Sequence, residues 1–297
     1  MNDNVIATQG LSKSYNGKPA LRGLDLAVPR GAIYGFLGRN GAGKTTTLKL
    51  LLGMLRRDAG EISLLGVPIR SEKDSVVARR RIAFVTEEKE LYPFMNVGQM
   101  IRFTRPFYPT WRRELEEKYL DVFRLPLNLS VSKLSKGMRT QLMLLLAMAR
   151  GAELLIMDEP TSGLDPVATE EVLQALADLA AGDRATILFS SHQLTEVEQI
   201  CDRVCVIDDG KTVIDGVLDD LKMQYRRVVL VFDGEPPQGV ANLPGVDHLR
   251  RKGRTVSLLA HTDIDGVVDR ARELAPVSVE VHAVSLKELF MDHVRGE

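Results

Sequence analysis

The stretch Gly38-Arg39-Asn40-Gly41-Ala42-Gly43-Lys44-Thr45 decides the fold, because it fits the pattern G-x-x-x-x-G-K-[ST] at every position. An apolar run at 33–37 precedes it with the length of a strand, and residues 45–55 follow with a helical pattern. The glycines let backbone N–H groups surround phosphate oxygens, and the helix start adds partial positive charge. Lys44 would reach the outer phosphates and the Thr45 hydroxyl would bind Mg²⁺. The sequence therefore predicts a phosphate-binding loop, with an ordinary glycine-rich turn as the alternative.

The rest of the first 220 residues is typical of an α/β fold. Three further apolar runs of strand length are separated by helical patterns: residues 82–85, 154–157 and 186–189. Such runs indicate parallel strands that are covered on both faces. Residues 5–28 alternate around the turn signal Asn16-Gly17, which predicts an antiparallel β portion. The pattern between about residues 92 and 150 is helical, most clearly at 111–123.

The last part of the chain has a different sequence pattern. Residues 228–232 and 256–259 resemble strands, and residues 264–274 resemble a helix. We therefore expect a domain at 1–222 with a helical subdomain at about 88–150, followed by a small α+β accessory domain at 223–297.

Composition narrows the function classes. With 44% hydrophobic and 27% charged residues among 297, the chain is globular and not disordered. Its 39 basic and 40 acidic residues provide no excess of positive charge, which argues against nucleic-acid binding. Two cysteines form no disulfide framework and favour a reducing cytoplasm. The longest apolar run, 142–149, is far shorter than the roughly 20 residues of a membrane span, so any membrane contact is expected through a partner.

A second candidate site follows the apolar run at 154–157. The carboxylates of Asp158 and Glu159 come directly after this expected strand, at the edge where open α/β sheets bind ligands. Asp158 would hold a water molecule bound to Mg²⁺, and Glu159 would act as the general base toward the attacking water. An apolar strand followed by Asp-Glu-Pro is by itself a weak signal, and it gains weight from the phosphate-binding loop.

A third motif, Leu134-Ser135-Lys136-Gly137-Met138, resembles the Leu-Ser-Gly-Gly-Gln signature of ATP-binding subunits of ABC transporters. Further family motifs follow in the family's order over residues 5 to about 220. Tyr15 stands where an aromatic ring stacks on adenine, Ser162-Gly163-Leu164-Asp165 matches the D-loop, and His192 matches the switch histidine. The resemblance implies a P-loop NTPase fold with a mixed-sheet core, an antiparallel β portion and a helical subdomain.

The resemblance also implies the ligands, ATP and Mg²⁺, and the residues that hold them. The catalytic residues it implies are Glu159, His192 and Lys44. Those it implies for nucleotide binding are Tyr15, Gly38, Asn40, Gly41, Gly43, Lys44, Thr45, Thr46, Glu87, Ser135, Gly137, Asp158 and Asp165. Those it implies for the metal are Thr45, Glu87 and Asp158.

The family further implies its partners. Two cassettes would form a head-to-tail dimer, with a second copy or a homologous ATPase subunit, in which Ser135 and Gly137 meet the γ-phosphate held by the other subunit. Plain helix capping by Ser135 uses the same geometry and stays open. Integral-membrane permease subunits on a separate chain would carry the substrate, and the complex would be an exporter. The chain is therefore expected at the cytoplasmic face of the cell membrane.

Two departures from the family pattern bear on the chemistry. Glu87 stands where the family has a glutamine that contacts Mg²⁺ and water; a carboxylate can still bind Mg²⁺ but adds negative charge near the phosphates. Lys136 and Met138 replace a glycine and a glutamine of the signature, and Lys136 either adds charge toward the nucleotide or points to solvent.

Aromatic residues gather between Phe84 and Phe123. They form either the core of the helical subdomain or, for Tyr92 and Phe94, anchors for a membrane subunit. A soluble ABC ATPase of DNA repair or translation is the rival interpretation, but the chain has one phosphate-binding loop and no heptad run. A GTPase switch is a third, and no Asn-Lys-x-Asp motif supports it.

Overall fold

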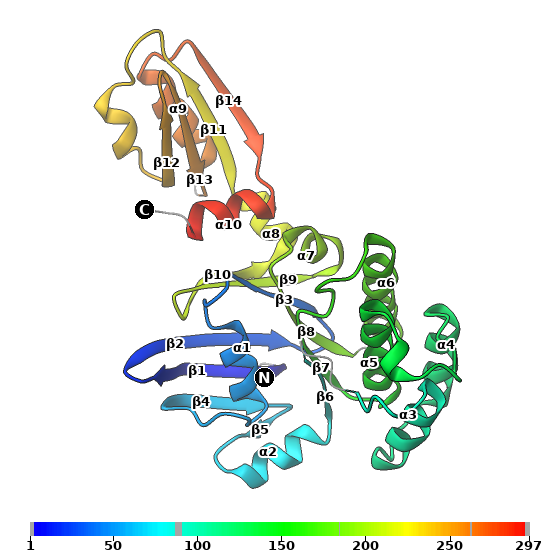
Figure 1. Ribbon diagram of the computed structural model, residues 1–297. Coiled ribbons are helices and arrows are strands. Elements are labelled where there is room, and N and C mark those ends of the chain that lie inside the picture. Colours follow the sequence, from blue (N-terminus) through cyan, green and yellow to red (C-terminus); the bar gives the residue numbers. More distant parts are fainter. Residues whose placement is uncertain (1–2, 87–90, 184, 262, 295–297) are drawn as a thin grey trace. The chain divides into compact units, whose positions relative to one another are not determined.

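The computed structural model describes residues 3–86, 91–183, 185–261 and 263–294 (Figure 1). The chain separates into two compact units, Met1–Thr212 and Val213–Glu297, and the predicted domain boundary at 222 falls inside the second unit. Among the described residues no helix is both long and apolar enough to cross a membrane.

The first unit contains two sheets and seven α-helices within the described ranges. Its strands are β1 (Asn4–Tyr15), β2 (Lys18–Pro29), β3 (Ile33–Gly38), β4 (Ala59–Leu64), β5 (Val67–Pro68), β6 (Ile82–Val85), β7 (Leu154–Asp158), β8 (Thr186–Ser191), β9 (Arg203–Asp208) and the first residues of β10 (Lys211–Val217). Its helices are α1 (Lys44–Leu51), α2 (Glu72–Arg79), α3 (Val97–Thr104), α4 (Arg113–Val122), α5 (Lys136–Ala149), α6 (Pro166–Asp183) and α7 (Leu194–Ile200), with short 3₁₀ turns η1 (Arg105–Phe107) and η2 (Val131–Lys133).

One sheet is antiparallel, with strand order β2-β1-β4-β5. Strands β1 and β2 form a hairpin whose turn is Asn16-Gly17, and both turn residues have positive φ, at 50° and 78°. This left-handed backbone is the one that a tight hairpin turn requires, and Asn and Gly adopt it at low cost. The predicted antiparallel portion is confirmed.

The other sheet has the order β10-β9-β3-β8-β7-β6. Strands β3, β6, β7, β8 and β9 run parallel, and β3 lies between β8 and β9. The four apolar runs predicted as buried strands are therefore confirmed, each within one or two residues of its end. Because parallel strands present their carboxyl ends at one edge, the ends of β3, β7 and β8 meet there.

Helix α1 lies between the two sheets (Figure 1). Its Leu48, Leu50 and Leu51 belong to one buried cluster with side chains of both sheets, among them Ile6 of β1 and Ile156 of β7. The prediction that this helix extends to Leu55 is wrong.

The helix ends at Leu51 because Gly53 has a φ of 66° and reverses the chain. The N–H of Gly53 donates to the Leu50 carbonyl (3.0 Å), and the N–H of Met54 donates to the Lys49 carbonyl (2.9 Å). This pair of bonds is the Schellman motif, which satisfies the last carbonyls of a helix.

The second unit is a four-stranded antiparallel sheet with helices. Its elements are α8 (Leu218–Gln224), β11 (Arg226–Val231), η3 (Gln238–Asn242), β12 (Val246–Lys252), β13 (Thr255–Ala260), α9 (Ile264–Glu273), β14 (Ser278–Ala283) and α10 (Leu286–Val294), with sheet order β12-β13-β11-β14. Alternate residues of β11 and β13 pack on the buried face of α9 in a core of their own. The predicted strands and helix correspond to β11, β13 and α9.

Helix α10 is attached to this sheet by a buried carboxylate. The side chain of Asp292 is fully buried, and its two oxygens lie 2.6 Å from Arg227 and 2.6 Å from Arg250. Arg227, on β11, is itself only 8% exposed. A buried charge of this kind is stable only while its partners are present.

Candidate functional site

The phosphate-binding loop runs from Gly38, the last residue of β3, to Lys44, the first of α1. The Lys44 ammonium is buried and donates to the Gly38 carbonyl (2.7 Å), so the lysine folds back over the loop. Gly43 precedes the helix with a φ of 109° and no side-chain cap, which leaves the first N–H groups of α1 to an incoming anion. A Cβ at position 43 would lie 2.8 Å from the Ala20 carbonyl of β2, so only glycine fits there.

A cavity of about 270 Å³ opens over this loop. It is lined by eight residues that the sequence predicted: Asn40, Gly41, Gly43, Lys44, Thr45, Thr46, Glu159 and His192. It is also lined by Ala20 and Arg39, which were not predicted as site residues. The structure thus brings together residues from the ends of β3, β7 and β8.

Ser190 of β8 forms hydrogen bonds with both Asp158 and Glu159 at the end of β7. The Ser190 hydroxyl donates to the Asp158 carboxylate (2.6 Å) and accepts from the Glu159 N–H (3.0 Å). Glu159 has a left-handed φ of 50°, a backbone conformation that costs about 1–2 kcal/mol for a residue with a side chain. Ser190 was not predicted as a site residue, because its contacts with Asp158 and Glu159 appear only in three dimensions.

Glu159 is the centre of the charged groups in the cavity. Its Oε2 lies 2.7 Å from Nδ1 of His192, and its Oε1 lies 3.7 Å from the Lys44 ammonium. Glu159 and Lys44 are each 7% exposed, whereas the His192 side chain is about half exposed. A buried carboxylate held between two nitrogen groups at the mouth of a phosphate loop can accept a proton from a water molecule placed there.

The donor set also fits Mg²⁺. Thr45 lines the cavity, and the Asp158 carboxylate, 4% exposed, directly precedes Glu159, which also lines it. Hydroxyl and carboxylate oxygens are the hard ligands that Mg²⁺ takes beside phosphate oxygens. Glu87, the third metal ligand in the prediction, lies outside the described residues.

The signature segment packs against the D-loop of its own chain. The Ser135 hydroxyl accepts from the Met138 N–H (3.1 Å) and so caps α5, as the capping alternative expects. A Cβ on Gly137 would touch Leu164 at 3.8 Å, and the Lys136 side chain lies across Gly163, where a Cβ would collide with it. The Lys136 side chain therefore covers Gly163 of the D-loop. Neither of its predicted positions, toward the nucleotide or toward solvent, included this contact.

The remaining predicted residues do not line the cavity. The Asp165 carboxylate accepts from the N–H groups of Val167 and Ala168 (3.0 Å each) and begins α6. Tyr15 is 44% exposed, and the Lys13 ammonium lies 5.9 Å from the centre of its ring. An exposed aromatic ring beside a lysine is open to a stacking partner.

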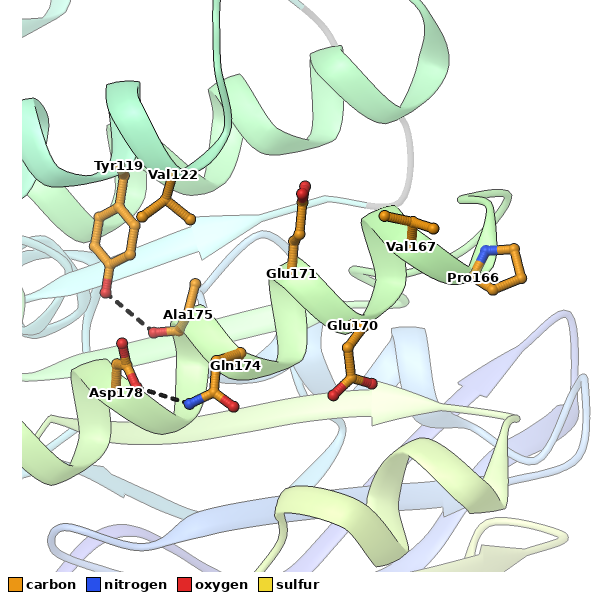
Figure 2. A pocket seen from close by; sticks show the side chains of 9 residues that line it. All are labelled: Tyr119, Val122, Pro166, Val167, Glu170, Glu171, Gln174, Ala175 and Asp178. Atoms are coloured by element: carbon orange, nitrogen blue, oxygen red, sulfur yellow. Dashed lines mark hydrogen bonds between the residues drawn. The ribbon is translucent and has the colours of Figure 1, made fainter.

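A second cavity, of about 580 Å³, lies between α4 and α6 (Figure 2). Tyr119 on α4 and Ala175 on α6 are joined there by a hydrogen bond of 3.1 Å from the tyrosine hydroxyl to the carbonyl. Apolar side chains and the carboxylates of Glu170, Glu171 and Asp178 form its walls. Carboxylates repel a triphosphate, so phosphate chemistry belongs to the cavity over the phosphate loop.

Four exposed aromatic rings follow one another between residues 92 and 107. The ring centres of Tyr92 and Phe94 are 5.6 Å apart, those of Tyr92 and Phe103 are 5.4 Å apart, and those of Phe103 and Phe107 are 5.4 Å apart. Phe94 is 76% exposed and Tyr92 is 46% exposed. The interpretation of these two residues as core is therefore wrong, and they form an exposed apolar surface.

A phosphate-binding loop, a buried carboxylate pair and a histidine at the carboxyl edge of a parallel sheet define a P-loop nucleotide hydrolase.

Comparison with known proteins identifies the family within this class. The sequence pattern of the ABC transporter family matches residues 21–162. The ABC transporter ATP-binding protein YtrB of Bacillus subtilis is 29% identical over 99% of this chain and 99% of that protein. The Nod factor export ATP-binding protein I of Rhizobium etli is 32% identical over 97% of this chain and 92% of that protein. A solved ATP-binding subunit of an ABC transporter is 30% identical, with a TM-score of 0.66 over 74% of this chain and 92% of that one.

The chain belongs to the family of ABC transporter ATP-binding proteins, and it is an ATPase of that family. The resemblance seen in the order of its motifs is confirmed, as is the α/β fold of the cassette.

Proposed function

We propose that this chain is the subunit that binds and hydrolyses ATP to power an ABC exporter, through ATP-driven head-to-tail dimerisation. The observation that carries the proposal is the Glu159 carboxylate, held between His192 (2.7 Å) and Lys44 (3.7 Å) at the mouth of the phosphate-binding loop. This arrangement supports in-line attack of water on a γ-phosphate, since such catalysis depends on position and charge more than on covalent chemistry.

Each charged residue has a distinct part in this proposal. Lys44 and the N–H groups at the start of α1 bind the phosphates, and Glu159 takes the proton of the attacking water. His192 orients Glu159 through the bond at Nδ1 and lines the same cavity as the phosphate-binding loop. Thr45 and Asp158 would hold Mg²⁺, which would neutralise negative charge on the phosphates.

The proposed partners are a second cassette and the permease subunits of the membrane. Ser135 and Gly137 stand at the start of α5, where a helix N-terminus favours the γ-phosphate of the facing subunit. The exposed rings of Tyr92 and Phe94 are the proposed contact for a permease, which would hold the chain at the cytoplasmic face of the membrane. We further propose 1–222 as the cassette, with its helical subdomain at about 88–150, and 223–297 as an accessory domain.

Export is supported by the relatives that cover most of the chain. One of these relatives is named for Nod factor export, and the chain spans 92% of its length. Another relative is named for bacitracin transport, at 34% identity over 75% of this chain.

The experiment is a pair of variants, Glu159→Gln and Glu159→Gln combined with Lys44→Ala. The first should bind MgATP, lose turnover by about 10²–10⁴-fold, and elute as a dimer in gel filtration with ATP, because only the general base is lost. The double variant should remain monomeric under the same conditions. A monomeric Glu159→Gln protein that binds ATP would contradict the dimer, and unchanged turnover would contradict the role of Glu159.

A further inference from the structure

A buried glutamate behind the catalytic pair has no part in the chemistry described so far. Glu196 lies in the first turn of α7 and is 3% exposed. Its Oε2 accepts from the Thr161 hydroxyl (2.7 Å) and from the Ser191 hydroxyl (3.1 Å). No described residue donates to its Oε1. A carboxylate with one unsatisfied oxygen is costly to bury, so the presence of Glu196 in the interior needs an explanation beyond packing.

The two hydroxyls belong to the two segments that carry the catalytic pair. Thr161 comes two residues after Glu159 and is 1% exposed, and Ser191 directly precedes His192 and is fully buried. Glu159 and His192 are in turn joined by their own bond of 2.7 Å. The side chains of Glu196, Thr161 and Ser191 therefore close a ring behind the Glu159–His192 bond.

The same ring includes the start of the D-loop. The Thr161 carbonyl accepts from the Leu164 N–H (3.1 Å), and the Glu159 carbonyl accepts from the Ser162 N–H (3.1 Å). Leu164 and Gly163 in turn contact the signature segment at Gly137 and Lys136. These contacts connect the D-loop to Thr161 and, through Glu196, to Ser191.

We infer that Glu196 is a positioning residue, which holds the Glu159 and His192 segments at a fixed separation and links this separation to the D-loop. The inference rests on the proposed hydrolysis at Glu159. Burial raises the pKa of the Glu196 carboxyl above its usual range, while the hydroxyls of Thr161 and Ser191 act in the opposite direction. The two hydroxyls therefore stabilise a Glu196 carboxylate whose burial costs electrostatic free energy.

The test compares Glu196→Gln with Glu196→Leu in the full chain. The glutamine keeps a carbonyl oxygen that can accept from both hydroxyls, whereas the leucine keeps the volume and loses the acceptor. We expect Glu196→Leu to lower kcat by tenfold or more, since misplacement of catalytic groups by about 1 Å costs on the order of 100-fold. The KM for ATP should stay near that of the wild type, because the phosphate loop is intact. Glu196→Gln should keep most of kcat.

Thr161→Val removes one donor of the same ring and keeps the size and β-branching of the side chain. This variant should lower kcat, as Glu196→Leu does. In the double variant the fold-loss of kcat should be smaller than the product of the two single fold-losses, because both changes break the same link.

Glu116 provides a matched control in the helical subdomain. It is also a buried carboxylate with two donors, Arg105 (2.5 Å) and Trp111 (2.6 Å), but it lies on α4, away from the cavity. Glu116→Leu should lower the melting temperature and leave kcat per folded molecule unchanged.

The inference is overturned if Glu196→Leu keeps a normal kcat per folded molecule, or if Glu196→Gln loses as much as Glu196→Leu, which would make the charge the active feature. A wild-type protein without ATPase activity would instead contradict the proposed function itself.

Discussion

Replacement of both Tyr92 and Phe94 by alanine tests the exposed aromatic surface. An aromatic side chain presents about 150–250 Å², so exposures of 46% and 76% leave roughly 250 Å² for a partner to cover. At about 25 cal/mol per Å² this area sets a ceiling near 6 kcal/mol, and the costs of association reduce it. We expect a loss of about 3 kcal/mol, or roughly a hundredfold in affinity for the permease.

The same variant should change the isolated subunit little. The tyrosine ring packs edge-on against Phe103 at 5.4 Å, a contact of about 0.5–1.5 kcal/mol. The melting temperature should therefore fall by no more than about 2–6 °C, whereas two core cavities would cost at least 6 kcal/mol. Basal ATPase activity should stay near normal.

The assay combines a thermal melt with co-purification of the permease from detergent-solubilised membranes. Alanine at Met54 and Val77, each 52% exposed, is the matched control and should co-purify fully. A Tyr92/Phe94 variant that co-purifies as well as this control would refute the docking role of the surface.

Three further predictions concern single side chains. Lys44→Ala should weaken ATP binding by about 10–100-fold in calorimetry, because a charged hydrogen-bond donor to the phosphates is lost; unchanged binding would contradict the loop assignment. Asp292→Ala should destabilise the second unit by about 3–5 kcal/mol in chemical denaturation, since it leaves Arg227 buried without its 2.6 Å partner, and a change below about 1 kcal/mol would show that the pair is dispensable. If Glu87 stands in for the family's glutamine, Glu87→Gln should keep or raise the hydrolysis rate, because the change removes a negative charge beside the phosphates, and a loss beyond about tenfold would indicate a role for the carboxylate itself.

Residues of the site that lie within one continuous motif could be predicted from the sequence. The motif at residues 38–45 already has a glycine at position 43, where the backbone lies close to β2. The apolar run before Asp158 already places its carboxylate at a sheet edge. These signals are local, so the chain order alone carries them.

Contacts between distant segments could not be predicted in the same way. The bond from Thr161 to Glu196 spans 35 residues, and in the sequence Glu196 is only one of two acidic residues on a short helix. Ser190 gave no signal either, because a serine in an apolar strand has no motif of its own.

Some elements were missed for a different reason. Strand β12 (Val246–Lys252) ends in Arg250-Arg251-Lys252 and is mostly exposed at the edge of its sheet, so it lacks the apolar pattern of a core strand. By contrast, Gly53 was a readable stop signal for α1, and it marks where the helix ends.

The place of β3 in its sheet has a consequence for biosynthesis. The phosphate-binding loop leaves from this strand, yet Ile33 pairs with Ile187 of β8, and Tyr34 pairs with Arg203 of β9. At translation rates of about 5–20 residues per second, these neighbours leave the ribosome roughly 10–30 seconds after β3. Nascent chains that stop before β8 therefore carry the whole loop sequence without the sheet that shapes it, and ribosome-bound fragments should acquire ATP binding only once β9 has emerged.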